Sequence, residues 1–187
     1  MPKSASERFT GAVLTGGRST RMGRDKALIA VDGVPLAVRA ATALRDAGAT
    51  AVVAIGGDLD ALAALGLDAR TDLDPGEGPL GAILTAFAAA PTDLVVVLAC
   101  DLPLVDAATV RCLLQTIGDH AAAVPVTDRA HPLCAVYRAS RCGAPLGQAF
   151  AAGERAVHRA LEALDAVPVE LPDPEVLRNV NRPGDLS

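Results

Sequence analysis

The chain has 187 residues, of which 51% are hydrophobic, and it carries a formal net charge of −5 with a sequence pI of about 5.1. This length and apolar content predict one packed globular domain rather than a disordered chain. The acidic balance argues against a nucleic-acid-binding protein, which needs a basic surface, so any anionic ligand must be held by cations gathered locally.

The first half of the chain alternates apolar strands with helices. The expected strands are Phe9–Thr15, Thr50–Ile55, a weakly signalled Ala69–Asp72 and the unbroken apolar run Asp93–Ala99. The expected helices are Pro35–Ala47, Leu59–Leu65 and Pro79–Ala90. Buried strands that alternate with helices are typical of a parallel sheet covered on both faces.

The second half of the chain is less regular. It begins with a helix over Asp106–Ile117 whose first residue is an acidic N-cap. Two strands follow with only a short connection, VTDRAHP, between them, and this indicates a mixed sheet. The expected strands are Ala121–Val126, Leu133–Tyr137 and Val167–Leu171, and the expected helices are Ala144–Ala151 and Ala156–Leu164, before an irregular tail.

Neither membrane insertion nor secretion is indicated. No apolar segment reaches the length of a membrane span without a breaker, and the first residues, MPKSASERFTG, lack the apolar core of a signal peptide. The four cysteines have no C-x-x-C spacing, which argues against a zinc knuckle and favours small buried side chains in a reducing compartment. We therefore expect a cytoplasmic protein with neither a membrane nor a nucleic acid as partner.

Three polar features follow strands at their carboxyl ends, where ligands bind in open α/β sheets. The first is a loop with the sequence TGGRSTRMGRDK, in which Gly16 and Gly17 allow close approach of the backbone, with its amides directed at a ligand. Its cations are Arg18, Arg21, Arg24 and Lys26. It lacks the Gly-Lys-Ser/Thr of a Walker loop and the G-x-G-x-x-G of a dinucleotide fingerprint. A phosphate site is favoured over the alternative, a glycine-rich turn with solvated cations.

The second and third features supply carboxylates. Asp101 lies in the segment Cys100-Asp101-Leu102-Pro103, just after the apolar strand Asp93–Ala99. An oxygen ligand there suits Mg²⁺, although a turn or helix cap would use the same residue. Asp72, with the turn around Gly78 after it, could hold a base or a ribose, or it could end a strand. Asp74 has similar chemistry two residues later, and the sequence leaves the choice between the two open.

Further polar residues stand in the second half. His131 lies before a proline between two strands and could be functional or an exposed turn residue. Asn179 and Asn181 flank one apolar residue, so in a strand both side chains would face the same side. The alternative is a polar tail without a function.

The chain resembles the molybdenum cofactor guanylyltransferases over nearly its whole length. The motifs that carry this resemblance are LTGGRSTRMGRDKAL, GPLGAI, CDLP, HPLCAVY, AGERAV and NVNRPGDL, in this order. The opening motif is shared by a broad superfamily of nucleotidyltransferases, whereas HPLCAVY and NVNRPGDL narrow the choice to the molybdopterin branch. Two positions depart from the family pattern: Thr15 replaces the usual alanine, and Gly81-Ala82 replaces the usual Ala-Gly, which leaves base selectivity open.

The resemblance implies a three-layer, Rossmann-like α/β nucleotidyltransferase fold with a mostly parallel, mixed sheet and helices on both faces. It implies one domain over residues 1–187, with a nucleotide-binding part over about 8–105 and a cofactor-substrate part over about 106–187. Mg²⁺ is the implied cofactor, GTP and molybdopterin are the implied substrates, and molybdoenzymes or their chaperones are candidate partners.

The family pattern also implies roles for particular residues. Arg21, Lys26 and Asp101 would be catalytic, and Asp101 would bind Mg²⁺. The nucleotide would be bound by Leu14, Thr15, Gly16, Gly17, Lys26, Asp72, Gly78 and Asp101. His131, Asn179 and Asn181 would line the substrate cleft.

The implied reaction is in-line attack of the terminal phosphate of molybdopterin on the α-phosphorus of GTP, which releases pyrophosphate and forms the guanine dinucleotide form of the cofactor. Catalysis would rest on positioning and charge neutralisation, without a covalent intermediate. The alternatives are a molybdopterin cytidylyltransferase or a sugar-phosphate nucleotidyltransferase on the same fold, and a nucleotide-binding module without turnover. The presence of Lys26 and Asp101 counts against the last of these.

Overall fold

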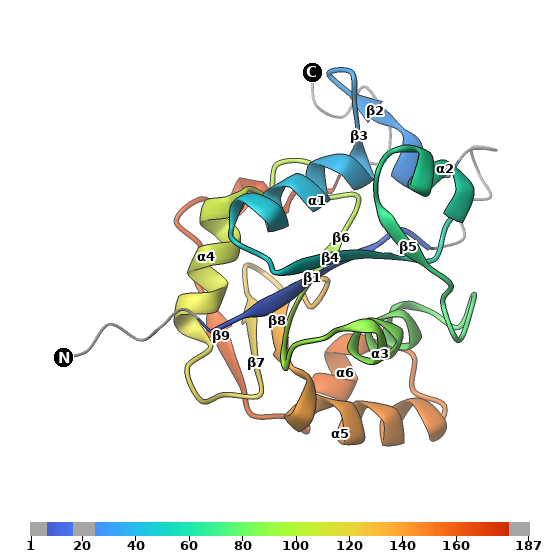
Figure 1. Ribbon diagram of the computed structural model, residues 1–187. Coiled ribbons are helices and arrows are strands. Elements are labelled where there is room, and N and C mark those ends of the chain that lie inside the picture. Colours follow the sequence, from blue (N-terminus) through green and yellow to red (C-terminus); the bar gives the residue numbers. More distant parts are fainter. Residues whose placement is uncertain (1–6, 17–24, 180–187) are drawn as a thin grey trace.

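The computed structural model describes residues 7–16 and 25–179 of the chain. Their centre is a seven-stranded sheet in the order β5-β4-β1-β6-β8-β7-β9 (Figure 1). These strands are β1 (Phe9–Leu14), β4 (Ala51–Ile55), β5 (Asp68–Arg70), β6 (Leu94–Ala99), β7 (Ala122–Pro125), β8 (Cys134–Arg138) and β9 (Ala166–Val169). Strands from both parts of the chain thus join one sheet.

Helices cover both faces of the sheet and form a three-layer α/β fold. They are α1 (Leu36–Asp46), α2 (Leu59–Ala64), α3 (Pro79–Ala89), α4 (Ala107–Thr116), α5 (Ala139–Ala151) and α6 (Val157–Leu161). Helices α1 and α4 lie on one face, and α3, α5 and α6 lie on the other (Figure 1). Side chains of β1 alternate accordingly, because Val13 joins the core under α1 while Ala12 and Leu14 join the core over α3. The predicted fold class is confirmed.

Strand direction explains which loops can meet. Strands β4, β1 and β6 are parallel in register, with Leu14 paired to both Ile55 and Ala99. Strand β8 pairs antiparallel with β6 and β7, as the short connection after residue 125 predicted, and β9 is again parallel to β7. The loops after β5, β4, β1 and β6 therefore all leave from the same edge of the sheet.

The helix expected at Ala144–Ala151 begins earlier, at Ala139, and continues through Pro145. Its start is held by a residue distant in sequence, because Asp93 accepts hydrogen bonds from the amide of Ser140 at 2.8 Å and from its hydroxyl at 3.0 Å. Pro145 lies inside α5, where a proline removes one backbone hydrogen bond of the helix. The long-range contact to Asp93 outweighs that local cost.

Four short elements were not predicted. A hairpin of β2 (Ala30–Val31) and β3 (Val34–Pro35) turns at Asp32 and Gly33, both of which have positive φ. Two short 3-10 helices are η1 (Lys26–Leu28) and η2 (Pro174–Leu177). Two strands begin and end earlier in the sequence than expected. Strand β5 covers Asp68–Arg70 where Ala69–Asp72 was expected, and β9 covers Ala166–Val169 where Val167–Leu171 was expected.

The cysteines match the interpretation as small core residues. Cys100, Cys134 and Cys142 are buried, while Cys112 is half-buried, and none is in a disulfide. Burial raises the pKa of the Cys134 thiol to about 12. Within the described residues, no helix is long and apolar enough to cross a membrane.

Candidate active site

The end of β1 is fixed by its neighbour β4. The amides of Thr15 and Gly16 both donate to the carbonyl oxygen of Ile55, each at 3.0 Å. The Thr15 hydroxyl is buried and lies 2.8 Å from the carbonyl oxygen of Gly56 and 3.0 Å from that of Ile55. The side chain of Leu14 is also buried. The expectation that the Gly16 amide faces a ligand is therefore wrong, because this amide continues the contact with β4.

Gly16 instead provides space for the turn after β4. A Cβ atom on Gly56 would lie 3.0 Å from the Cα atom of Gly16, and Gly56 has a φ of +76°. Glycine at both positions lets the two loops pack backbone against backbone. Gly17 and Arg21, as well as Arg18 and Arg24, belong to residues 17–24 and lie outside the described residues, so their predicted roles stay predictions.

Three predicted site residues from distant parts of the chain meet at one carboxylate. The Nζ atom of Lys26 lies 3.0 Å from Oδ2 of Asp101, and the Nδ2 atom of Asn179 donates to the same oxygen at 2.9 Å. The side chains of Lys26 and Asp101 are only 21% and 20% exposed. The second predicted amide, Asn181, lies outside the described residues, and Asn179 is in no strand.

The other carboxylate oxygen of Asp101 is different. Oδ1 is buried and has no hydrogen-bond partner among residues 7–16 and 25–179. A buried carboxylate oxygen without a donor is costly unless it meets a cation or a ligand. This oxygen fits a Mg²⁺ ligand, because Mg²⁺ commonly takes one or two protein carboxylates and completes its shell with phosphates and water. The described part of the chain contains no group of three or more His, Cys, Asp or Glu side chains that could hold a metal ion. A metal ion at Asp101 would therefore need phosphates and water as further ligands.

Cys100, directly before Asp101, is not poised as a nucleophile. Its side chain is 7% exposed. Burial, followed by the negative charge of Asp101, raises the pKa of its thiol to about 12. The thiolate that nucleophilic chemistry needs is therefore absent near neutral pH.

Asp25, which was not predicted as a site residue, caps the short helix that begins with Lys26. Its Oδ1 atom accepts from the amide of Ala27 at 3.0 Å and caps η1, while its Oδ2 atom accepts from the amide of Asp58 at 2.9 Å. The Asp25 side chain thus ties the end of the first loop to the turn after β4. The sequence shows Asp25 beside Lys26, but it does not show that Asp25 binds the backbone amide of Asp58, 33 residues away.

The Asp72 carboxylate is held in a similar way. Its Oδ1 atom accepts from the hydroxyl of Thr85 at 3.0 Å and from the amide of Asp74 at 3.2 Å. Asp74 packs on the first turn of α3, where a Cβ atom on Gly81 would approach the Cβ atom of Asp74 to 3.1 Å. Glycine at position 81, a departure from the family pattern, makes room for this loop.

Gly78 begins α3 with a φ of +93° and lies beside Arg155. The Nε atom of Arg155 donates to Glu77 at 2.8 Å, and its guanidinium stacks on the ring of Phe150 at 4.1 Å. This ion pair and stacking contact hold the loop before α3 against the end of α5. Arg155 belongs to the AGERAV motif, whose contacts within the fold were not predicted.

The side chain of His131 is not part of the Asp101 cluster, which we define as Asp101, Lys26 and Asn179. Its Nε2 atom is 2.8 Å from the hydroxyl of Thr127, which in turn donates to Asp128. Burial, followed by the charge of Arg129, lowers the pKa of His131, so its imidazole is neutral at neutral pH. The residue lines a hollow of about 240 Å³ together with Thr127, Pro174, Glu175, Leu177 and Arg178. Residues 174–178, which contribute to the lining of this hollow, lead directly to Asn179. The segment 174–179 therefore borders both the hollow and the Asp101 carboxylate.

Comparison with known proteins identifies the family of the chain. A model described as the MobA-like NTP transferase domain matches residues 11–169 of the chain. The chain belongs to this family. Members similar to it include the molybdenum cofactor guanylyltransferase of Burkholderia vietnamiensis, 35% identical with 97% of this chain and 95% of the relative covered. The probable molybdenum cofactor guanylyltransferase of Chloroflexus aggregans is 34% identical, with 95% and 91% covered.

Solved structures also resemble this MobA-like protein. The molybdopterin-guanine dinucleotide biosynthesis protein A of Archaeoglobus fulgidus has a TM-score of 0.75 and 26% identity, with 95% of this chain and 94% of that chain covered. The 2-C-methyl-D-erythritol 4-phosphate cytidylyltransferase of Thermus thermophilus has a TM-score of 0.71 at 20% identity, with 94% of each chain covered. The second likeness shows the fold alone. The protein is a nucleotidyltransferase with a Rossmann-like fold.

Proposed function

We propose that the protein transfers GMP from GTP to the terminal phosphate of molybdopterin and releases pyrophosphate, which forms the guanine dinucleotide form of the molybdenum cofactor. The names of the relatives support these substrates. The observation that carries the proposal is the Asp101 carboxylate. One of its oxygens is held by Lys26 and Asn179, and the other is buried and receives no hydrogen bond from the described residues.

The transfer needs little covalent help from the protein. An oxygen of the molybdopterin phosphate forms a bond to the α-phosphorus of GTP while the bond from that phosphorus to the bridging oxygen breaks, and pyrophosphate leaves with the electron pair. A phosphate monoester is largely ionised near neutral pH, so no general base is required. The side chains therefore act by positioning and by charge neutralisation.

Asp101 is the residue that would hold Mg²⁺, through the Oδ1 atom that no described residue contacts by a hydrogen bond. When bound, the metal would neutralise charge on the phosphates. Lys26 and Asn179 both bind Oδ2 of this carboxylate, which leaves Oδ1 without a donor from residues 7–16 and 25–179. Lys26, and Arg21 in the loop before it, would offset charge on the transferred and leaving phosphates.

Guanosine would be recognised around Asp72 and Gly78, at the adjacent loop before α3. Asp72 is favoured over Asp74 because its carboxylate is oriented by a hydrogen bond from another element, whereas Asp74 packs against Gly81. His131, Asn179 and Asn181 would line the molybdopterin side of the cleft.

The experiment is pyrophosphate release from GTP, CTP or ATP, each with Mg²⁺ and molybdopterin. We expect release with GTP and at least about tenfold less with CTP, a difference of about 1.4 kcal/mol in transition-state binding. Preference for CTP would reject the base assignment but keep the reaction class. Release from GTP that does not depend on molybdopterin would reject the acceptor.

A further inference from the structure

Thr85 on α3 is a buried polar residue that the proposed mechanism does not use. Its side chain is 4% exposed, although α3 packs into an apolar core. A threonine inside a helix often turns its hydroxyl back to the carbonyl four residues earlier. Thr116 does this in α4, where its hydroxyl donates to the carbonyl oxygen of Cys112 at 2.9 Å. Thr85 instead points out of its helix.

The Thr85 hydroxyl holds the loop after β5 at two neighbouring residues. It donates to Oδ1 of Asp72 at 3.0 Å and accepts from the amide of Leu73 at 3.1 Å. Leu73 itself is 68% exposed, so apolar packing does little to fix this part of the loop. The position of Asp72 therefore depends on polar contacts, and Thr85 provides the one that comes from a rigid helix.

The two carboxylate oxygens of Asp72 differ in their hydrogen bonds. Oδ1 receives both the Thr85 hydroxyl and the amide of Asp74, while no hydrogen bond from residues 7–16 or 25–179 reaches Oδ2. A carboxylate has acceptor capacity on both oxygens. Oδ2 is thus the oxygen available to an N–H or O–H donor of a nucleoside.

We propose that Thr85 is a positioning residue for nucleoside binding, which acts by fixing the Asp72 carboxylate with Oδ2 toward the nucleoside. This inference rests on the proposed role of Asp72 in the nucleotide site. Thr85 does not touch the nucleotide. Its loss affects nucleotide binding more than the chemical step, because the reacting phosphates belong to the Lys26 and Asp101 region.

The test compares Thr85→Val with Thr85→Ser and a matched control, Thr109→Val. Thr109 is also a buried helical threonine, 7% exposed, and its hydroxyl donates to Asp106 at 2.9 Å at the start of α4. Thr85→Val should raise the KM for GTP about tenfold, the scale of a hydrogen bond to a charged group, and leave kcat within about threefold. Thr85→Ser should restore KM, and Thr109→Val should lower stability without changing KM.

A double-mutant cycle tests whether Thr85 acts through Asp72. In the Asp72→Asn background, Thr85→Val should raise KM by less than about twofold, because the group that it positions has already been changed. An equal rise in both backgrounds, or a KM near the parent value for Thr85→Val alone, would overturn the proposal. If Thr85→Val does not fold, as judged by circular dichroism, Thr85→Ala removes the same hydroxyl without placing a methyl group against the carboxylate.

The cycle is measured with the nucleotide that the parent protein uses best. Preference of the parent for CTP would therefore reject guanylyl transfer while the coupling between Thr85 and Asp72 could still be measured. Conversely, a GTP-specific parent with no coupling would reject the positioning role and leave the proposed function standing.

Discussion

Two aspartates in the site share one arrangement at the scale of single residues. In both Asp101 and Asp72, one carboxylate oxygen receives two protein donors and the other receives none from the described residues. Donors on one oxygen hold the carboxylate in a fixed orientation, and the second oxygen keeps its acceptor capacity. Their positions after predicted strands and the family resemblance identified both residues in the sequence, but neither could show which oxygen is available.

A variant of Lys26 tests whether the loop after β1 binds the nucleotide or only forms a turn. Because Lys26 forms an ion pair with the largely buried Asp101, Lys26→Ala should lower the free energy of unfolding by about 1 kcal/mol without nucleotide. It should also reduce turnover about 100-fold, as expected for the loss of one preorganised charge. Thermal-shift titration with Mg²⁺ and GTP should show a much smaller ligand-induced stabilisation than in the parent.

Arg39→Ala is the control for this titration, since Arg39 is a partly buried cation paired with Asp32 outside the site. Its ligand-induced shift should equal that of the parent. Equal shifts for the parent and Lys26→Ala would mean that the phosphates bind elsewhere. Lys26→Arg should restore only part of the shift, because a planar guanidinium does not replace a compact ammonium group.

At the scale of elements, the sequence predicted best where local signals decide the structure. The apolar runs of β1 and β6 and the capped helix α4 lie close to their expected positions. Prediction failed where partners are distant: the start of α5 depends on Asp93, and the orientation of Asp72 depends on Thr85. The site followed the same pattern, since Lys26, Asp101 and Asn179 were predicted separately and only the fold brings them together.

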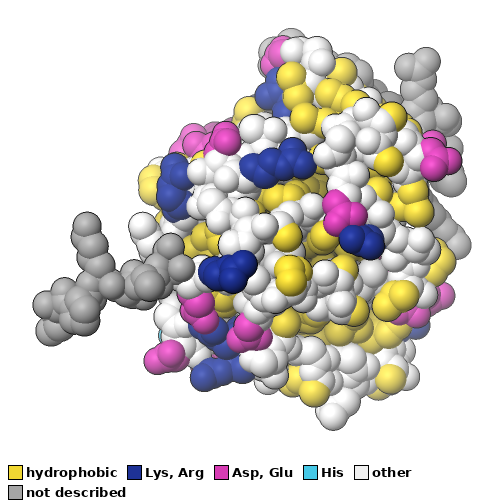
Figure 2. Space-filling view, in the orientation of Figure 1, with side chains coloured by type: hydrophobic (Ala, Val, Ile, Leu, Met, Phe, Trp, Pro, Cys, Tyr) yellow, Lys and Arg dark blue, Asp and Glu magenta, His cyan; other side chains and the backbone are white. Residues whose placement is uncertain are grey.

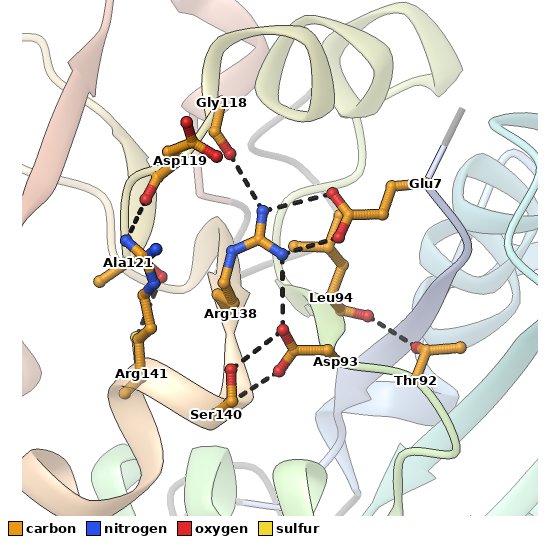
Figure 3. A network of polar contacts seen from close by, with 11 residues as sticks. Glu7, Thr92, Asp93, Leu94, Gly118, Asp119, Ala121, Arg138, Ser140 and Arg141 are labelled. Atoms are coloured by element: carbon orange, nitrogen blue, oxygen red, sulfur yellow. Dashed lines mark hydrogen bonds and ion pairs between the residues drawn. The ribbon is translucent and has the colours of Figure 1, made fainter. Parts of the chain in front are cut away.

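The start of α5 belongs to a polar network that also joins the beginning of β6 and Glu7 (Figure 3). Arg138 donates to Glu7 at 2.7 Å, to Asp93 at 3.4 Å and to the carbonyl oxygen of Gly118 at 3.0 Å. Burial alone would raise the pKa of Asp93, but hydrogen bonds from Ser140, together with Arg138, outweigh it and hold that pKa below the usual value of an aspartate.

This network predicts a pH dependence of stability. A carboxyl group with a lowered pKa in the folded state stabilises the protein above its unfolded pKa of about 3.9, and this contribution is lost as the pH falls through the folded value. Urea unfolding from pH 6 to pH 3 should therefore show a smaller loss of stability for Asp93→Asn than for the parent. Asp46→Asn, at an exposed carboxylate without a hydrogen bond among the described residues, should follow the parent. A parallel pH profile for Asp93→Asn would contradict the assignment.

At the scale of the whole molecule, charge is dispersed rather than gathered. On the face shown in Figure 2, Lys and Arg side chains are scattered among Asp and Glu side chains, and the net charge is −5. A long-range field that attracts polyanions is therefore not expected. The proposed binding of a triphosphate would instead depend on the local arrangement at the carboxyl edge of the sheet, where the ends of β1, β4 and β6 adjoin.

The central claim is that this edge transfers a nucleotidyl group with Asp101 as the metal-binding residue. The most direct measurement follows GTP radiolabelled at its α-phosphorus in the presence of Mg²⁺ and molybdopterin, for the parent and for Asp101→Asn. The parent should move the label into a molybdopterin dinucleotide with equal release of pyrophosphate, and Asp101→Asn should remain folded but lose about 100-fold or more of this transfer. Label that remains in GTP or appears only as free GMP with the parent, or equal transfer by Asp101→Asn, would contradict the account.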